Sequence, residues 1–219
     1  MSRLRPFAFA ALLALPLAAC ADINVGRIDS PGSSFDTVNG SIRVGANSVV
    51  GDLETVNGSV FLGDDSRGED LETVNGDIHV GDNVRIDSAE TVNGDIVAGV
   101  ELRCSGDLET VNGDIRLGRG ADVDESVVTV NGRILLDGAR VRGALEIVSG
   151  EIETGRGSKI GAITVHEARG SKTSKGKPRV TVGADSVVGP IVFEQAGELR
   201  VHRSARVGKI SGVEPVYFD

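Results

Sequence analysis

Acidic side chains that recur at a fixed spacing are the first candidates for chemistry in this sequence. They form two series in which each member stands 18 or 19 residues after the one before: Glu54, Glu72, Glu90 and Glu109, and Asp77, Asp95 and Asp114. Oxygen ligands of this kind suit Ca²⁺, so the four glutamates are candidate metal ligands. The alternative, which we favour, is a solvated charged face that keeps strand edges soluble.

The familiar catalytic signatures do not occur in the sequence. It contains no phosphate-binding loop, zinc-protease motif, serine-hydrolase elbow or paired CxxC. The three histidines, His79, His166 and His202, share no common phrase, and we expect each to be an exposed strand residue. Because the carboxylates follow a repeat, the repeat explains them without catalysis. The sequence therefore predicts a protein that is not an enzyme and uses no cofactor.

Basic residues gather in one segment near the C-terminus. Residues 170–179 contain Lys172, Lys175, Lys177 and Arg179 among glycine and serine, and they interrupt the spacing seen elsewhere. We expect a protruding loop insertion here. It is either a plain solvated loop or a contact for an anionic partner, such as lipopolysaccharide or the acidic end of another copy.

Charge is divided along the chain. Residues 21–155 hold 10 Lys or Arg and 26 Asp or Glu, a net charge of −16, whereas residues 156–219 hold 11 and 6, a net charge of +5. The formal total of −9 argues against a general nucleic-acid-binding protein. Only 3% of residues are aromatic, so the core must be aliphatic.

The first twenty residues have the layout of a secretory signal peptide. Arg3 and Arg5 precede an apolar run over residues 7–17, which is too short to span a bilayer as a permanent helix. The small residues directly before Cys20 resemble the lipobox of bacterial lipoproteins. The resemblance implies a signal peptide at 1–19, a lipidated N-terminus at 20–22 with Cys20 acylated, and a membrane anchor. The alternative is an ordinary signal peptide in which Cys20 is incidental.

Two further inferences concern this N-terminal region. Ala21 follows Cys20, and in enterobacterial lipoproteins the absence of Asp at that place favours the outer membrane. If Cys20 is lipidated, Cys104 has no cysteine with which to form a disulfide. We expect Cys104 to be a small buried residue.

An internal repeat determines which elements position these residues. The string TVNG begins at six threonines separated by 18, 18, 18, 19 and 19 residues: Thr37, Thr55, Thr73, Thr91, Thr110 and Thr129. A degenerate copy follows at residues 147–150. After each NG comes an apolar-x-apolar triplet, as in Ile78-His79-Val80. Such triplets, punctuated by Gly, Asn and Asp, predict very short strands joined by turns.

The repeat predicts an all-β, single-stranded parallel β-helix (a β-solenoid) over residues 23–219, with about ten turns of 18–19 residues. Strands would pair with their equivalents one turn away, and stacked aliphatic columns would fill the core. The first column is Ile23, Ile42, Val60, Ile78, Ile96, Ile115, Ile134, Ile152, Val180 and Leu199. The second is Val25, Val44, Leu62, Val80, Ala98, Leu117 and Leu136, and the third is Leu53, Leu71, Ala89, Leu108, Val127, Leu145, Ile163, Ile191 and Ile210.

The TVNG string itself predicts one corner of the coil. We expect its Thr to point inward, its Asn side chains to hydrogen-bond from turn to turn, and its Gly to take the positive φ that a sharp corner needs. The Val between Thr and Asn can face either way, and outward it would form an apolar stripe. Both hands of the coil fit the spacing, and we favour the right-handed one. Residues 213–219 are expected to cap the last turn.

The recurrent phrase LETVNGDI is similar to the bacterial β-strand-repeat adhesin family, which is related to the auto-transporter adhesin head (GIN) domain. The resemblance covers about residues 23–163, and residues 180–212 look more like bactofilins. These families imply a right-handed β-helix, no enzyme activity and no catalytic residues to carry over. Bactofilins polymerise end to end and are mostly cytoplasmic, from which the lipobox here departs.

Together these observations predict a lipid-anchored protein of the cell envelope, in the outer membrane, that acts as an adhesin-like or scaffolding module. Its partners would be the membrane, through Cys20, and an anionic envelope polymer or further copies joined through the rod ends. The alternative is a β-helix protein that binds or processes polysaccharide, because β-helices also carry clustered carboxylates that cleave glycosidic bonds.

Overall fold

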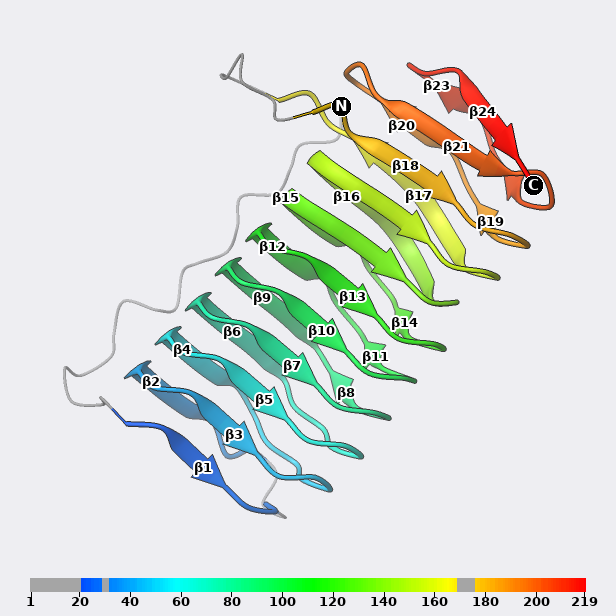
Figure 1. Ribbon diagram of the computed structural model, residues 1–219. Coiled ribbons are helices and arrows are strands. Elements are labelled where there is room, and N and C mark those ends of the chain that lie inside the picture. The colour runs from blue at the N-terminus through cyan, green and yellow to red at the C-terminus, as the bar shows by residue number, and fades with distance from the viewer. Residues whose placement is uncertain (1–20, 29–31, 169–175) are drawn as a thin grey trace.

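The computed structural model describes residues 21–28, 32–168 and 176–219. These residues contain no helix, and their 24 strands belong to one continuous sheet in which all pairings are parallel. Each strand pairs with its equivalent one turn later, for example Ile78 with Ile96 and then Ile96 with Ile115. The fold is therefore the predicted β-solenoid, with about ten turns coiled into a rod (Figure 1).

The coil has three faces, and the longer strands bend around a corner from one face to the next. The first face carries the TVN segments: β2 (Phe35–Asn39), β4 (Leu53–Asn57), β6 (Asp70–Asn75), β9 (Ser88–Asn93), β12 (Leu108–Asn112), the start of β15 (Val127–Leu136), the middle of β16 (Arg140–Thr154), the end of β17 (Lys159–Val165), β20 (Ile191–Phe193) and β23 (Ile210–Ser211).

The second face carries the triplets that follow NG: β1 (Ile23–Val25), β3 (Ile42–Val44), β5 (Val60–Leu62), β7 (Ile78–Val80), β10 (Ile96–Ala98), β13 (Ile115–Leu117), the ends of β15 and β16, β18 (Arg179–Val182), β21 (Glu198–His202) and β24 (Pro215–Phe218). The third face is built of very short pieces: bridges at Val49 and Arg67, β8 (Arg85–Ile86), β11 (Arg103–Cys104), β14 (Asp122–Val123), the starts of β16 and β17, β19 (Val187–Val188) and β22 (Arg206–Val207).

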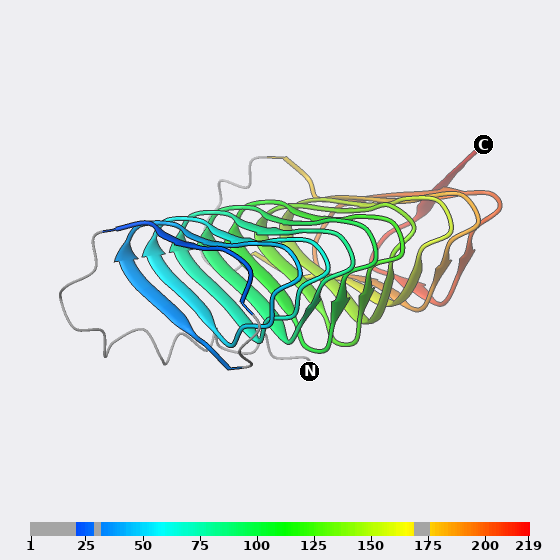
Figure 2. The same cartoon turned by 90° about the horizontal axis from the view of Figure 1, so that it is seen from below.

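The hand of the coil can be followed in the figures. The near strands in Figure 1 run toward the lower right while successive turns advance to the upper right, which makes the coil right-handed, as favoured from the sequence. Figure 2 shows the same turns from below, with the C-terminus at the far end of the rod from β1.

The three predicted aliphatic columns form the core. Apart from Ile23, Val25 and Ile210 at the two ends, their members are buried, with at most 5% of their surface exposed. The third face adds a column that the sequence patterns did not suggest: Val50, Ile86, Cys104, Val123, Val141, Ile160 and Val188. Each turn packs only on its neighbours, so burial accumulates along the rod.

The six TVNG threonines point inward, as predicted, and are almost completely buried. A buried hydroxyl needs a hydrogen-bond partner. From Thr55 onward it donates to the carbonyl oxygen of a glycine one turn earlier, whereas Thr37 donates to that of Ala21. The Thr73 hydroxyl lies 2.9 Å from the Gly58 carbonyl oxygen, and the Thr91 hydroxyl lies 3.0 Å from that of Gly76. The valines between Thr and Asn are half-buried and face outward beside the glutamates.

The asparagine side chains form the predicted ladder. Each side-chain amide donates to the oxygen of the preceding Asn across 2.9–3.0 Å, from Asn57 on Asn39 up to Asn131 on Asn112. Ser149 ends the series by donating to the Asn131 side-chain oxygen at 2.7 Å.

The expectation of positive φ at the TVNG glycines is wrong, since none of the six has it. Glycine is required there for another reason: a Cβ on Gly94 would lie 1.9 Å from the carbonyl oxygen of Gly76, and the same clash repeats along the column. Most residues with positive φ lie instead where the second face meets the third: Asn47, Asp65, Asn83, Glu101, Gly120, Gly138, Gly157 and Asp185. Gly150, which pairs with Gly132 in the degenerate copy, has positive φ as well.

The two ends of the core are less covered than its middle. The apolar residues that are only partly buried against it lie in the first turn and in the last one: Ile23, Ile28 and Phe35, then Ala205, Val207, Ile210 and Val213. Within the segment predicted to be a cap, β24 pairs in register with β21 as one more rung of the second face. Its Val216 and Tyr217 are 63% and 50% exposed.

Candidate interaction faces

The glutamates of the repeat form one column on the first face. Glu54, Glu72, Glu90 and Glu109 pair in register on consecutive strands and face outward. Burial first, and then the charges of the neighbouring Glu54 and Glu90, raise the pKa of Glu72 to about 7. The pKa values of Glu54 and Glu90 are also raised, first by burial. Among the described residues, no three His, Cys, Asp or Glu gather as a group that suits a metal ion.

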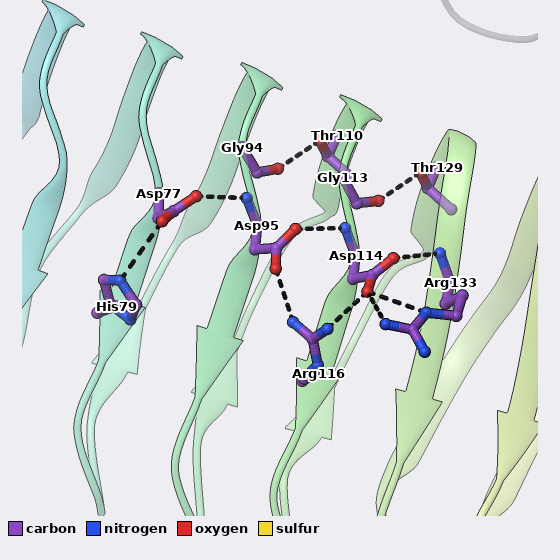
Figure 3. Close-up of polar contacts among 10 residues, drawn as sticks. All are labelled: Asp77, His79, Gly94, Asp95, Thr110, Gly113, Asp114, Arg116, Thr129 and Arg133. Carbon is purple, nitrogen blue, oxygen red and sulfur yellow. Dashed lines mark hydrogen bonds and ion pairs between the residues drawn. The ribbon is translucent and has the colours of Figure 1, made fainter.

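The aspartate series has a structural task on the second face (Figure 3). Carboxylate oxygens of Asp77, Asp95 and Asp114 each accept the backbone N–H one turn later, at 2.8 Å in all three cases. Arg116 donates to Asp95 at 2.7 Å and to Asp114 at 2.6 Å, and Arg133 donates to Asp114 at 2.6 Å. The hydrogen bonds and the Arg116 ion pair lower the pKa of Asp95, although its partial burial acts the other way.

His166 contradicts the expectation that every histidine is an exposed strand residue. It follows β17 and only 4% of its surface is exposed. Its Nε2 lies 2.7 Å from Glu146 Oε2 and its Nδ1 lies 3.2 Å from Glu194 Oε2, so one ring links three consecutive turns. The His79 and His202 side chains are half-exposed.

Gln195 adds further contacts between the same turns, and we call the contacts of His166 and Gln195 together the His166 junction. Its side-chain amide donates to the carbonyl oxygens of Val148 at 2.5 Å and of His166 at 2.7 Å. These contacts replace the asparagine ladder beyond Ser149, because later turns have no NG. His166 stands where the repeat otherwise has the Val between Thr and Asn, since Val165 pairs with Ile147 and Ile147 with Thr129. A polar residue at that position was the available signal in the sequence.

The basic segment is described only from residue 176 onward. Lys172 and Lys175 lie outside the described residues, and Lys177 is exposed. Arg179 is the first residue of β18, not part of a protruding loop as expected, since it pairs in register with Glu151 and Glu198. Its Nε lies 3.2 Å from Glu198 Oε2. Cys20, the predicted lipidation site, also lies outside the described residues.

Cys104 is buried on the third face with 2% of its surface exposed, as expected. Burial raises the pKa of its thiol to about 12. Since the thiolate is the reactive form, burial and the raised pKa both disfavour reaction of this thiol at neutral pH.

The third face carries a column of basic residues that sequence reasoning missed. Arg67, Arg85 and Arg103 pair in register, and after Asp122 the column continues with Arg140 and Lys159. Except for Asp122 all of these side chains are exposed. Charge is thus divided around the rod as well as along it, with acidic glutamates on the first face and basic residues on the third.

Hollows lie along this basic column. One of about 240 Å³ is lined by Arg67, Arg85, Arg103, Arg142 and Asp87 among others, and a second of about 330 Å³ shares Arg103 and Asp122 with it. A third of about 460 Å³ shares Arg140 and Lys159 with the second. Shared lining residues make the three hollows one groove along the third face.

The comparisons with known proteins add no assignment to this geometry. No helix within the described ranges is long and apolar enough to cross a membrane. No family model, no curated protein and no solved structure matches the chain.

Proposed function

We propose that the protein is a non-enzymatic, adhesin-like or scaffolding rod of the cell envelope. The observation that carries this proposal is the regularity of the side-chain ladders. Acidic, amide and basic side chains run along the rod in separate columns, each in register, and the carboxylates of the second face are occupied with backbone N–H groups and arginines. Such a surface presents the same group repeatedly along its length, which suits binding to a repetitive partner.

The proposed place of the rod is the outer membrane, through a lipid on Cys20. Support comes from the sequence: the basic start, the apolar run, the small residues before Cys20 and the similarity to the lipobox. β1 begins at Ile23, only three residues after Cys20. A lipidated Cys20 would therefore hold the N-terminal end of the rod close to the membrane, with the C-terminal turns projecting from it.

Metabolic labelling with palmitate tests the anchor. We expect label on the full chain and none on Cys20→Ser, which should also leave the membrane fraction. The matched control is Cys104→Ser, which should keep the label because that thiol is buried. Label on Cys20→Ser, or none on the unaltered chain, would overturn the proposed anchoring.

Self-association through the rod ends is part of the proposal. The partly exposed apolar residues of the first and last turns and the exposed Val216 and Tyr217 of β24 support it. A terminal parallel strand also leaves backbone groups unpaired, which favours pairing with another strand.

A second candidate function is binding or processing of polysaccharide, and the groove on the third face favours it. One assay distinguishes binding of polysaccharide from its enzymatic processing. Incubation of the mature chain with acidic polysaccharides should show retention without shorter products if the protein binds, whereas released reducing ends or unsaturated sugars would identify an enzyme.

A further inference from the structure

The groove on the third face offers two kinds of hydrogen-bonding group in two parallel columns. The outward strand positions supply cations, and the positions two residues later supply acceptors, so that Arg85 is followed by Asp87 and Arg103 by Ser105. Equivalent groups on neighbouring turns stand about 4.8 Å apart, the spacing of adjacent strands.

The cationic column is available for a ligand. Arg67, Arg85, Arg140 and Lys159 are exposed and, among the described residues, make no ion pair. Arg103 stands 3.9 Å from Asp122 with 62% of its side chain exposed. Guanidinium groups bind carboxylates with two parallel hydrogen bonds, so a row of them suits an extended chain that carries acidic groups at intervals.

The acceptor column narrows the choice of ligand. Asp87 accepts the hydroxyl of Ser105 at 2.9 Å through one oxygen, and its other oxygen has no hydrogen bond within the described part of the chain. Asp124 pairs with Arg142, which also donates to Asp122 at 2.9 Å. Carboxylates here would repel a polyanion without hydroxyl groups along its chain, such as polyphosphate, and equally the glutamate column of a second copy. They can, however, accept hydrogen bonds from the hydroxyl groups of a sugar chain.

We propose that this groove binds a linear polysaccharide that contains uronic acids, with its carboxylates on Arg67, Arg85, Arg103, Arg140 and Lys159 and its hydroxyls on Asp87. The inference rests on the proposed function, a rod that binds a repetitive envelope partner, and adds the ligand class and its face. The sugar chain would lie along the rod axis and cross one turn after another.

Binding to immobilised polygalacturonate tests the site. A variant with Arg67→Gln, Arg85→Gln and Arg103→Gln should lose at least tenfold in affinity. The matched control has Arg43→Gln, Arg133→Gln and Arg200→Gln on the second face, which removes the same charge, and should stay within twofold. Unaltered thermal unfolding of both variants checks that the rod is intact. Equal losses in the two variants would overturn the groove as the site.

Two further measurements decide the ligand class. Asp87→Ala should weaken polygalacturonate binding, whereas simple attraction of an anion would become stronger when that negative charge is removed. Polyphosphate that binds as tightly as polygalacturonate, or groove arginines that control dimer formation in sedimentation, would also overturn the proposal. If these tests fail, the proposal of a lipid-anchored rod is unaffected, because the palmitate experiment does not depend on the groove.

Discussion

The first turns and the last turns of the rod share one register but not one sequence. From β2 to β15 the chain repeats TVNG, with Thr in the core and Asn in the ladder. From β16 onward the inward Thr position holds Ile147, Val165 and Phe193. Ile147 pairs with Thr129, and Val165 and Phe193 continue the same column in register. The asparagine ladder ends at Ser149, and the His166 junction takes its place.

This difference separates two roles of the repeat. Aliphatic columns continue through both regions, so the core needs only an apolar residue at the right position in each turn. Thr, Asn and Gly have separate roles at the corner. Thr donates to a buried carbonyl oxygen, Asn connects neighbouring turns, and Gly allows the backbones of neighbouring turns to approach closely. Where the later turns give up these residues, a single buried histidine between two carboxylates connects the turns instead.

The largest expected effect comes from removing that junction. His166→Phe removes both ring nitrogens that Glu146 and Glu194 contact, and the two lost hydrogen bonds together cost about 3 kcal/mol of unfolding free energy. Urea unfolding measures it. His79→Phe is the control, because the half-exposed His79 stacks on Phe61 at 4.8 Å and Phe can do the same. Equal losses in both variants would mean that the junction does not hold the later turns.

The next effect concerns the corner of the early turns. Gly94→Ala places a methyl group against the Gly76 carbonyl, and we expect a loss of about 1–3 kcal/mol from the resulting backbone shift. Gly26→Ala serves as the control, since nothing lies within 4 Å of the added atom. If thermal unfolding of Gly94→Ala matches that of Gly26→Ala, close approach of backbones is not the reason for glycine in TVNG.

The smallest expected effect is a change in how stability depends on pH, and its sign differs between the early turns and the later turns. Because the pKa of Glu72 is raised to about 7 in the fold, the folded chain binds more protons than the unfolded one between about pH 4.5 and 7. Stability from this group is therefore full below pH 4.5 and is lost as the pH rises through 7. Glu72→Gln should raise the melting temperature at pH 8 and flatten its dependence on pH.

Asp185 in the later turns supplies the contrast. Hydrogen bonds from Arg156 and Ser204 lower its pKa, so its contribution is present above its ordinary pKa and lost as the pH falls toward acid. Asp185→Asn should therefore leave the melting temperature between pH 5 and 8 with the same slope as the unaltered chain. A Glu72→Gln slope that also stays unchanged would show that the stacked glutamates titrate normally.

The sequence predicted the fold, the core columns, the inward Thr and the asparagine ladder because each depends on a period that is visible in the residues. The prediction from the sequence was wrong where a contact depends on how closely two backbones approach rather than on the spacing of the repeat. The glycines of TVNG illustrate this: their role is a clash with the carbonyl one turn earlier, which spacing alone cannot reveal.

The third face was missed for a different reason. Its strands are two residues long, so Arg85-Ile86 and Arg103-Cys104 show no alternation by themselves. The arginines are a column only once the register is known, and His166 is a junction only once Glu146 and Glu194 are brought beside it. Contacts between turns that differ in sequence cannot be recognised from the repeat alone.

Register between neighbouring turns also has a consequence for how such a chain can change in length. Val60 pairs with Ile78 and Arg67 with Arg85, each 18 residues apart, so removing one complete turn would bring matching strands together on all three faces. Duplication or loss of an 18-residue unit in the gene is then structurally silent in the core. Such a change alters the number of arginines in the groove, so the length of the acidic polysaccharide that we propose as its ligand would change in whole steps of one turn.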